Sequence, residues 1–240
     1  SEEVIAKVVG WVREATTLPV MVKFNALALN IGHKAKTVIN SGGNAVSGIN
    51  TIRSLNGIDI YDFVPYPKVD GGSCYSGLSG KPIKPIGLKY ISQIAAESDV
   101  PLSAIGGIYN WNDAAEYILA GASTLQVCSA VMENGYGIIH DLNNGLKNYM
   151  EKMNFEKIDD FVGLALPQIK KHNELSRKKK IYRIDSEKCI SCGKCIEACR
   201  DSAYQAISRT ENNKSIIDED KCDGCGLCAS ICPADCIALA

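Results

Sequence analysis

The sequence of 240 residues lacks any run of about 18 apolar residues, so no membrane-spanning helix is expected. Neither sign of charge is in excess, because 26 lysines and arginines stand against 27 aspartates and glutamates. Composition therefore gives no reason to expect binding to nucleic acid or to an anionic membrane. No secretory signal peptide is evident, and no G-x-G-x-x-G motif follows a predicted strand. We therefore do not expect this chain itself to bind NAD(P)H.

Histidine is scarce as well, and His33, His140 and His172 do not have the spacing of metal ligands. Cysteine is abundant, with eleven residues. Eight of these form two copies of one spacing, C-x2-C-x2-C-x3-C, at Cys189, Cys192, Cys195, Cys199 and at Cys222, Cys225, Cys228, Cys232. This spacing is the ligand run of a ferredoxin-type module with two 4Fe–4S clusters.

In such a module the fourth cysteine of each run reaches across to the other cluster. We therefore assign one cluster to Cys189, Cys192, Cys195 and Cys232, and the other to Cys199, Cys222, Cys225 and Cys228. A disulfide framework or paired zinc sites are disfavoured, because a zinc ribbon uses two cysteine pairs for each metal. Cys236 lies outside both runs, and we expect a buried thiol there. Clusters and free thiols require a reducing compartment, which predicts a cytoplasmic protein.

The first 165 residues alternate between apolar strand patterns and amphipathic helix patterns. Strands are predicted at 19–24, 44–50, 101–105 and 123–128, and helices at 32–40, 83–97, 113–119 and from about Ile138 to Met150. A glycine-rich stretch at 57–80 interrupts this alternation. Four successive βα units imply a parallel sheet. It belongs either to a doubly wound fold or to half of a (β/α)8 barrel, since a whole barrel needs about 250 residues.

Two domains and a connection are predicted: residues 1–169, a basic polar linker at 170–181, and the cysteine-rich module at 182–240. The chain begins with Ser1, which opens a helical pattern with Glu2 and Glu3 in its first turn. Because this helix looks like the middle of a domain, we expect residues upstream of Ser1 to be missing.

Unusual residues follow the predicted strands. Lys23 ends an otherwise apolar strand, and Asn50 and Thr51 end the next. Glycines and small polar residues end or follow the others, namely Gly80, Gly106, Gly107, Cys128 and Ser129. Glycines at strand ends let backbone N–H groups approach a phosphate, so these residues are candidates for holding a mononucleotide.

The order of motifs resembles a known family. The segments VKF, INT, GLSGKPIKPIGL, IGGI, DAAEYILAGAS and QVCSAV follow one another as in the second half of the dihydroorotate dehydrogenase-type flavoprotein barrel. The stretch Val131–Ile169, with GLKNYM and DDFVGLALPQI, resembles the NAD-dependent dihydropyrimidine dehydrogenase branch, in which a ferredoxin module also follows directly. The resemblance implies the C-terminal half of a (β/α)8 TIM barrel followed by a small α+β two-cluster ferredoxin-like domain.

The resemblance also implies site residues. Lys23 would contact FMN and stabilise the anionic reduced flavin, and Asn50 and Thr51 would bind a pyrimidine base. The FMN phosphate and ribityl chain would be held by Gly80, Gly106, Gly107, Cys128 and Ser129. The family's general acid, commonly a cysteine, lies on a loop before the lysine strand and is absent from this chain. A second departure is Asn25-Ala26, where the family usually has a Pro-Asn dipeptide soon after the lysine.

The implied activity is the reduction of uracil or thymine to 5,6-dihydropyrimidines with electrons from NAD(P)H. A FAD-containing flavoprotein partner would take the hydride, which implies a hetero-oligomer, and we expect this chain alone to be inactive. Two alternatives stay open: a dihydroorotate dehydrogenase-like enzyme with a fused ferredoxin, and a ferredoxin-type electron carrier.

Overall fold

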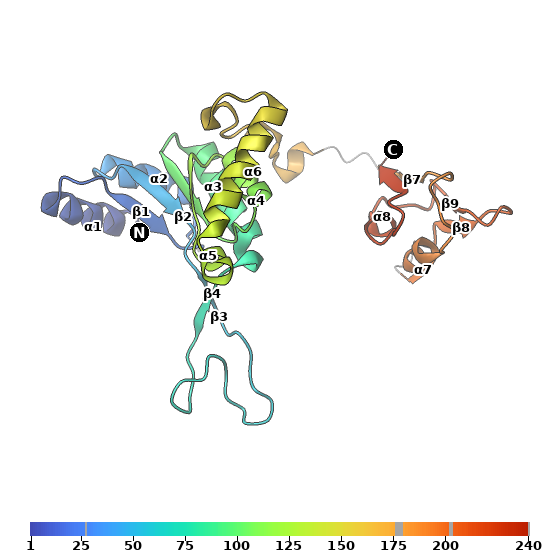
Figure 1. Cartoon of the computed structure of the whole chain (residues 1–240), viewed down its shortest axis with the longest axis horizontal. Helices are drawn as coiled ribbons and strands as arrows, with labels where there is room; N and C mark the ends of the chain where they lie inside the picture. Colours follow the sequence, from blue (N-terminus) through green and yellow to red (C-terminus); the bar gives the residue numbers. More distant parts are fainter. Residues whose placement is uncertain (27, 176–179, 202–203, 240) are drawn as a thin grey trace. The chain divides into compact units, whose positions relative to one another are not determined.

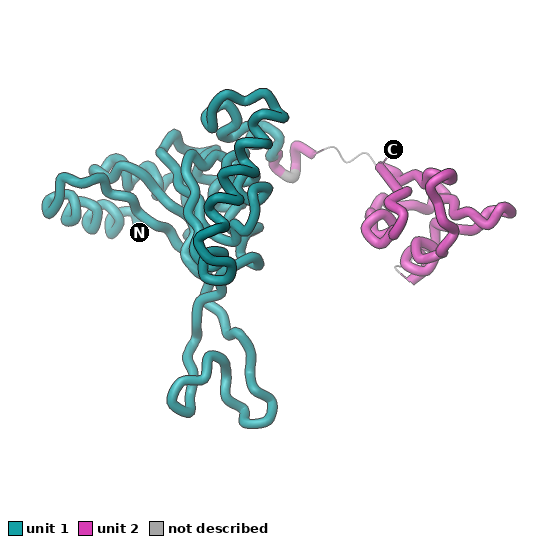
Figure 2. Tube along the Cα trace, viewed as in Figure 1, with its two compact units in different colours: residues 1–169 teal, residues 170–240 magenta. Residues whose placement is uncertain are grey.

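The computed structural model describes residues 1–26, 28–175, 180–201 and 204–239 (Figure 1). The chain divides into two compact units, Ser1–Ile169 and Lys170–Ala240 (Figure 2). Of the predicted linker at 170–181, residues 176–179 lie outside the described residues. Within the described ranges, no helix has both the length and the apolar character needed to cross a bilayer.

The first unit is built on a four-stranded sheet. Its strands are β1 (Met21–Phe24), β2 (Ala45–Gly48), β5 (Leu102–Ile105) and β6 (Thr124–Gln126), each shorter than predicted. All neighbours pair in parallel, which confirms the predicted parallel sheet. The strand order β1-β2-β5-β6 follows the chain without a reversal, so these strands show none of the switch points of a doubly wound sheet.

The helices of this unit form a layer in the same order as the strands. They are α1 (Glu2–Ala15), α2 (Ile31–Asn40), α3 (Lys84–Glu97), α4 (Trp111–Leu119), α5 (Ser129–Asn134) and α6 (Gly137–Met153), with 3₁₀ turns at η1 (Lys81–Ile83), η2 (Ile158–Asp160) and η3 (Leu166–Gln168). α1 packs on α2, α2 on α3, α3 on α4, and α4 on α6. Right-handed crossovers that all run in one direction place their helices on the same face of the sheet. The opposite face carries polar side chains, among them Ser47, Ser103 and Gln126.

Local signals explain where two helices begin. The Ser1 side chain accepts a hydrogen bond from the Val4 N–H, and Glu2 and Glu3 occupy the first turn of α1, as expected. α4 begins with a capping box, in which Asn110 accepts from the Asp113 N–H and the Asp113 carboxylate accepts from the Asn110 N–H. Asn110 is therefore the N-cap of α4.

The core lies between the sheet and the helices. Val38, Val46, Ile91 and Ile94 are wholly buried there, as the helical and strand periodicities predict. At the outer end of α6, an aromatic cluster closes the unit, with the Phe155 and Phe161 rings stacked at 5.1 Å. Burial of these rings holds the turns that follow α6 against the helical layer.

The glycine-rich stretch forms an element that was not predicted. β3 (Ile52–Ser54) and β4 (Ser76–Leu78) pair in antiparallel fashion, and the chain between them extends away from the sheet (Figure 1). Lys68 binds both Asp59 and Asp62 at 2.6 Å within this extension. Each strand has three residues, so neither shows enough alternation to be recognised in the sequence.

The second unit repeats one arrangement twice. β7 (Tyr182–Ile184), α7 (Lys194–Asp201) and β8 (Ile207–Arg209) precede β9 (Ser215–Ile217), α8 (Leu227–Ser230) and β10 (Ile237–Leu239). β7 pairs with β10 and β8 with β9, both antiparallel, and η4 (His172–Glu174) lies before the repeat. Each cysteine of the second run follows its counterpart by 33 residues, as Cys222 follows Cys189.

Candidate functional site

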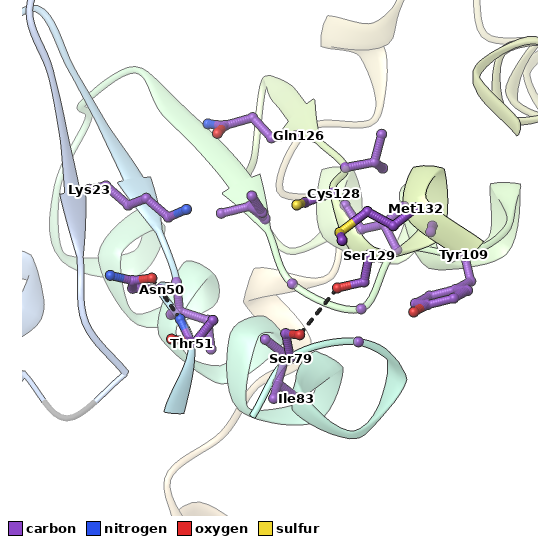
Figure 3. A pocket seen from close by; sticks show the side chains of 18 residues that line it. Lys23, Asn50, Thr51, Ser79, Ile83, Tyr109, Gln126, Cys128, Ser129 and Met132 are labelled. Carbon is purple, nitrogen blue, oxygen red and sulfur yellow. Dashed lines mark hydrogen bonds between the residues drawn. The ribbon is translucent and has the colours of Figure 1, made fainter. Parts of the chain in front are cut away.

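A cavity of about 300 Å³ opens at the carboxyl ends of the four parallel strands (Figure 3). All eight residues predicted for a flavin and substrate site line it: Lys23, Asn50, Thr51, Gly80, Gly106, Gly107, Cys128 and Ser129. They come from four different βα connections separated by up to about a hundred residues of sequence. Parallel strands bring their carboxyl ends to one edge, which is why these side chains meet.

Lys23 is the only charged residue among the described residues that line the cavity. It lies on β1 directly opposite Ser47 of β2, and its side chain points into the cavity that Asn50 also lines (Figure 3). The Asn50 side-chain oxygen accepts a hydrogen bond from the Thr51 N–H at 2.8 Å. This bond leaves the Asn50 amide nitrogen as the donor that a ligand would meet.

The glycines bring two backbone segments close together. Gly80 and Gly107 have φ values of +77° and +73°, which side chains rarely adopt. A Cβ on Gly107 would lie 2.9 Å from the Gly80 carbonyl oxygen and 2.8 Å from Cβ of Lys84. The turn after β5 can therefore approach the turn before η1 only because Gly107 lacks a side chain.

This part of the cavity suits a phosphate and a sugar alcohol. Ser129 donates a hydrogen bond to Ser79 at 3.3 Å, so two hydroxyls stand beside the glycine turns (Figure 3). Tyr109 closes the same end, where its hydroxyl donates to Glu133 at 2.6 Å. Burial, together with this bond to Glu133, raises the pKa of Tyr109 to about 12. The cavity thus offers one cation at one end and neutral hydroxyls with side-chain-free backbone at the other, and these donors fit FMN.

Gln126 is a cavity residue that the sequence reasoning did not assign. Its side-chain nitrogen donates to Ser47 at 2.9 Å and to Ser103 at 2.8 Å. Both serines are almost fully buried, at 1% and 2% exposure. Because both amide hydrogens are used, the Gln126 carbonyl oxygen remains as the acceptor on the cavity side. Ser47 and Ser103 are polar residues inside the otherwise apolar strands β2 and β5, and this pattern in the sequence could have indicated a buried hydrogen-bond donor such as Gln126.

An ion pair behind the cavity supports the glycine turns. Lys84 binds Asp113, and it binds Glu116 at 3.0 Å. Burial disfavours the charged lysine, but the bonds to the two carboxylates outweigh it and raise the pKa of Lys84. The buried Tyr117 hydroxyl donates to the Gly106 carbonyl at 2.7 Å, and burial raises its pKa. These contacts hold the Gly106-Gly107 turn against α3 and α4.

In the second unit the cysteines gather at two separate cavities. Site A is lined by Cys189, Cys192, Cys195 and Cys232, and site B by Cys199, Cys222, Cys225 and Cys228. These are the two sets predicted from the spacing, including the exchange of the fourth cysteine. No three acidic, histidine or cysteine side chains of the described residues converge on a single metal ion. Four thiols spread around a cavity instead suit a cluster of several irons.

The surroundings of the thiols differ. Backbone N–H bonds from Ser215 and Ser191 lower the pKa of Cys189, whereas burial raises the pKa of Cys228 to about 11. Cys236 also lines site A, with its sulfur 3.5 Å from that of Cys232. It is buried, as predicted. Cys74 is exposed between β3 and β4 and does not line the first cavity.

Comparisons with known proteins agree with this division. Residues 1–150 match the family model of dihydroorotate dehydrogenase, and residues 182–239 match that of the 4Fe-4S dicluster domain. The NAD-dependent dihydropyrimidine dehydrogenase subunit PreA of Escherichia coli K12 is 38% identical over the whole chain, which spans 59% of that protein.

Two further relatives match over less of the chain. The chloroplastic dihydropyrimidine dehydrogenase (NADP(+)) of Arabidopsis thaliana is 37% identical over 72% of this chain and 42% of its own length. The catalytic subunit of dihydroorotate dehydrogenase B (NAD(+)) from Thermococcus kodakarensis is 37% identical over 68% of this chain and 53% of its own length. The match over residues 1–150 shows that the chain belongs to the dihydroorotate dehydrogenase family, and a 4Fe-4S dicluster domain follows this part of the chain.

Proposed function

We propose that this chain is the FMN and iron–sulfur part of a dihydropyrimidine dehydrogenase. The protein would reduce uracil or thymine to the 5,6-dihydropyrimidine with electrons from NAD(P)H, delivered through a FAD-containing partner subunit. The observation that carries the proposal is the meeting of Lys23, Asn50 and Thr51 with the glycine turns in one cavity. Similarity to the Escherichia coli PreA subunit over the whole chain, ferredoxin part included, favours this branch of the family.

The first unit is proposed to be the C-terminal half of a (β/α)8 barrel, residues 1–169, that binds FMN. Support comes from the strand order without reversal, the single layer of helices, and the position of the cavity at the carboxyl ends of the strands. Residues 170–181 would link it to a ferredoxin-type domain at 182–240 with one 4Fe–4S cluster in site A and one in site B. The free thiols and clusters suit a reducing compartment such as the cytoplasm.

Within the cavity, each residue has a proposed role. The Lys23 ammonium stabilises negative charge on the bound flavin. Asn50 donates from its amide nitrogen to a carbonyl of the pyrimidine, and the Thr51 hydroxyl pairs with a neighbouring polar group of the base. Gly80, Gly106, Gly107, Cys128 and Ser129 hold the phosphate and ribityl chain. When bound, FMN supplies the exchange between one-electron transfer from the clusters and two-electron reduction of the base.

The test uses the intact protein, purified without oxygen together with its flavoprotein partner. NADH oxidation is followed after addition of uracil, with orotate in a parallel assay. Oxidation that depends on uracil supports the proposal. Oxidation with orotate alone would favour the dihydroorotate dehydrogenase alternative, to which the similarity over 68% of the chain also points. Clusters without bound flavin and without either activity would favour an electron carrier.

A further inference from the structure

Sites A and B are related by the internal repeat, so their surroundings can be compared position by position. Among the described lining residues, Lys194 is the only charged residue of site A and Asp223 the only charged residue of site B. The repeat places Leu227 where Lys194 stands, and Ile190 where Asp223 stands. The lining of the two sites therefore carries opposite charge.

A second cation lies beside site A. The Lys214 Nζ atom donates to the backbone carbonyl of Cys189 at 2.5 Å. Lys214 directly precedes β9, and its equivalent before β7 is Ile181, an uncharged residue. The ammonium is therefore held against a cysteine of site A by a hydrogen bond that has no charged equivalent at site B.

The hairpin of β8 and β9 brings a third cation to site A. The Arg209 guanidinium donates to the Ser191 carbonyl at 3.2 Å, within the loop that carries the first three cysteines. A Cβ on Gly193 in this loop would lie 2.7 Å from an Arg209 nitrogen. The same guanidinium also donates a hydrogen bond to the side-chain oxygen of Asn213 at 2.7 Å. The cation is thus fixed on the cysteine loop by bonds on two sides.

The other described charged residues beside the two runs line neither cavity. Lys188 and Lys221 occupy equivalent positions beside the two runs and each forms an ion pair with an aspartate. Glu197, on α7, is exposed and lines neither cavity. Lys180 is also exposed, and it is its backbone carbonyl that lies near Gly224 of site B.

Backbone hydrogen bonds to sulfur are present at both sites. At site B, the Ala206 N–H donates to Cys199 at 3.3 Å and the Gly224 N–H to Cys222 at 3.4 Å. At site A, the Ser215 and Ser191 N–H groups donate to Cys189. The feature that differs in sign between the sites is the side-chain charge of their lining residues.

Reduction of a 4Fe–4S cluster adds one electron and so one negative charge. Nearby cations stabilise that charge and a nearby carboxylate opposes it, and charge is one of the factors that set cluster potentials. We propose that the cluster of site A has the higher reduction potential, so that a single electron shared by the two clusters resides at site A. This inference rests on the proposed occupancy of both sites.

The experiment is a redox titration of the intact protein under anaerobic conditions, followed by EPR. Iron and sulfide are measured first, because fewer than two clusters would overturn the cofactor assignment, and this inference with it. Lys214→Met is then compared with the unchanged protein and with Lys214→Arg, which keeps the charge. We expect Lys214→Met to lower the higher of two midpoint potentials by about 59 mV, equivalent to a tenfold change in the one-electron equilibrium. Lys214→Arg should keep the higher midpoint potential close to that of the unchanged protein.

Asp223→Asn provides the opposite change with little alteration of shape. We expect it to raise the lower midpoint potential by a comparable amount and to leave the higher one nearly unchanged. Two clusters with equal potentials would overturn the inference. The same holds if Lys214→Met shifts the lower potential, or if Asp223→Asn shifts the higher one.

Discussion

Lys23 lies directly opposite Ser47 in the parallel pairing of β1 with β2. Ser47 in turn accepts a hydrogen bond at 2.9 Å from Gln126 of β6. The Lys23 position on β1 is therefore next to a pair of hydrogen-bonded side chains that joins β2 to β6. The cavity face of the sheet is therefore polar across its width, while the opposite face packs on the helices.

Replacement of Lys23 tests its proposed electrostatic role. We expect Lys23→Ala to lower kcat by about 10²–10³-fold, since loss of one preorganised charge-stabilising group typically has this effect. The measurement is the turnover of uracil by the intact protein with its partner, together with the flavin content. Lys36→Ala, an exposed lysine on α2, is the control and should keep full activity. Equal activity of both variants would contradict the assignment.

The hydrogen bonds of Gln126 are expected to stabilise the first unit. Gln126→Leu leaves the hydroxyls of Ser47 and Ser103 without their shared donor, which costs about 1–3 kcal/mol for each buried group left unpaired. Urea unfolding of the purified chain measures the loss. If Ser47 and Ser103 are first changed to alanine, we expect the Gln126→Leu change to cost much less. An additive result would mean that the three side chains are not coupled.

The close approach at Gly107 predicts a loss of flavin binding on substitution. Gly107→Ala combines a φ of +73° with a Cβ 2.9 Å from the Gly80 carbonyl, so the two turns must separate. We expect at least a tenfold weaker affinity for FMN, measured by titration of the flavin-free protein. Gly135→Ala is the matched control, because φ is +75° and nothing lies within 4 Å of its Cβ. Unchanged affinity in Gly107→Ala would refute the proposed phosphate cradle.

Two glycines inside helices should respond to alanine in opposite directions. A Cβ on Gly10 in α1 would have open space around it, and Gly10→Ala should raise the free energy of unfolding by about 1 kcal/mol. A Cβ on Gly87 in α3 would collide with the Tyr117 hydroxyl, which donates to the Gly106 carbonyl. We expect Gly87→Ala to lower Tm instead. Thermal unfolding of both variants decides this, and a stabilised Gly87→Ala would show that the packing of Tyr117 is loose.

The ion pair of Lys84 predicts a pH dependence at the alkaline side. The pKa of Lys84 is raised above its ordinary value of 10.5, so the stabilisation it contributes is present below that pH. It is lost as the pH rises through the higher pKa of the folded state. Asp113→Asn should cost about 3 kcal/mol at pH 8, because it leaves a partly buried ammonium with one partner fewer. Denaturant unfolding at pH 8 and near pH 12 measures this difference, which should shrink at the higher pH.

The periodic features of the fold could be predicted from the sequence. The four parallel strands and most of the helices beside them follow from apolar periodicity, but the short helix α5 was not predicted. The two short strands β3 and β4 could not be predicted, because three residues are too few to show a period. Their pairing also depends on how the chain between them folds back. The cavity residues could be proposed from the sequence because they follow predicted parallel strands, whose carboxyl ends lie at one edge of the sheet.

The two cysteine sets could be proposed from the chain alone, because the repeated spacing identifies a module in which the fourth cysteine of each run reaches across to the other cluster. Which charges lie beside them depends on the folded arrangement. Lys214 and Cys189 are 25 residues apart in the sequence, and their contact depends on how the β8–β9 hairpin packs on the first cysteine loop. The same holds for Gln126, which is 79 residues from Ser47 and meets it only because β2, β5 and β6 share one sheet. Contacts between distant residues depend on packing, and no local pattern encodes them.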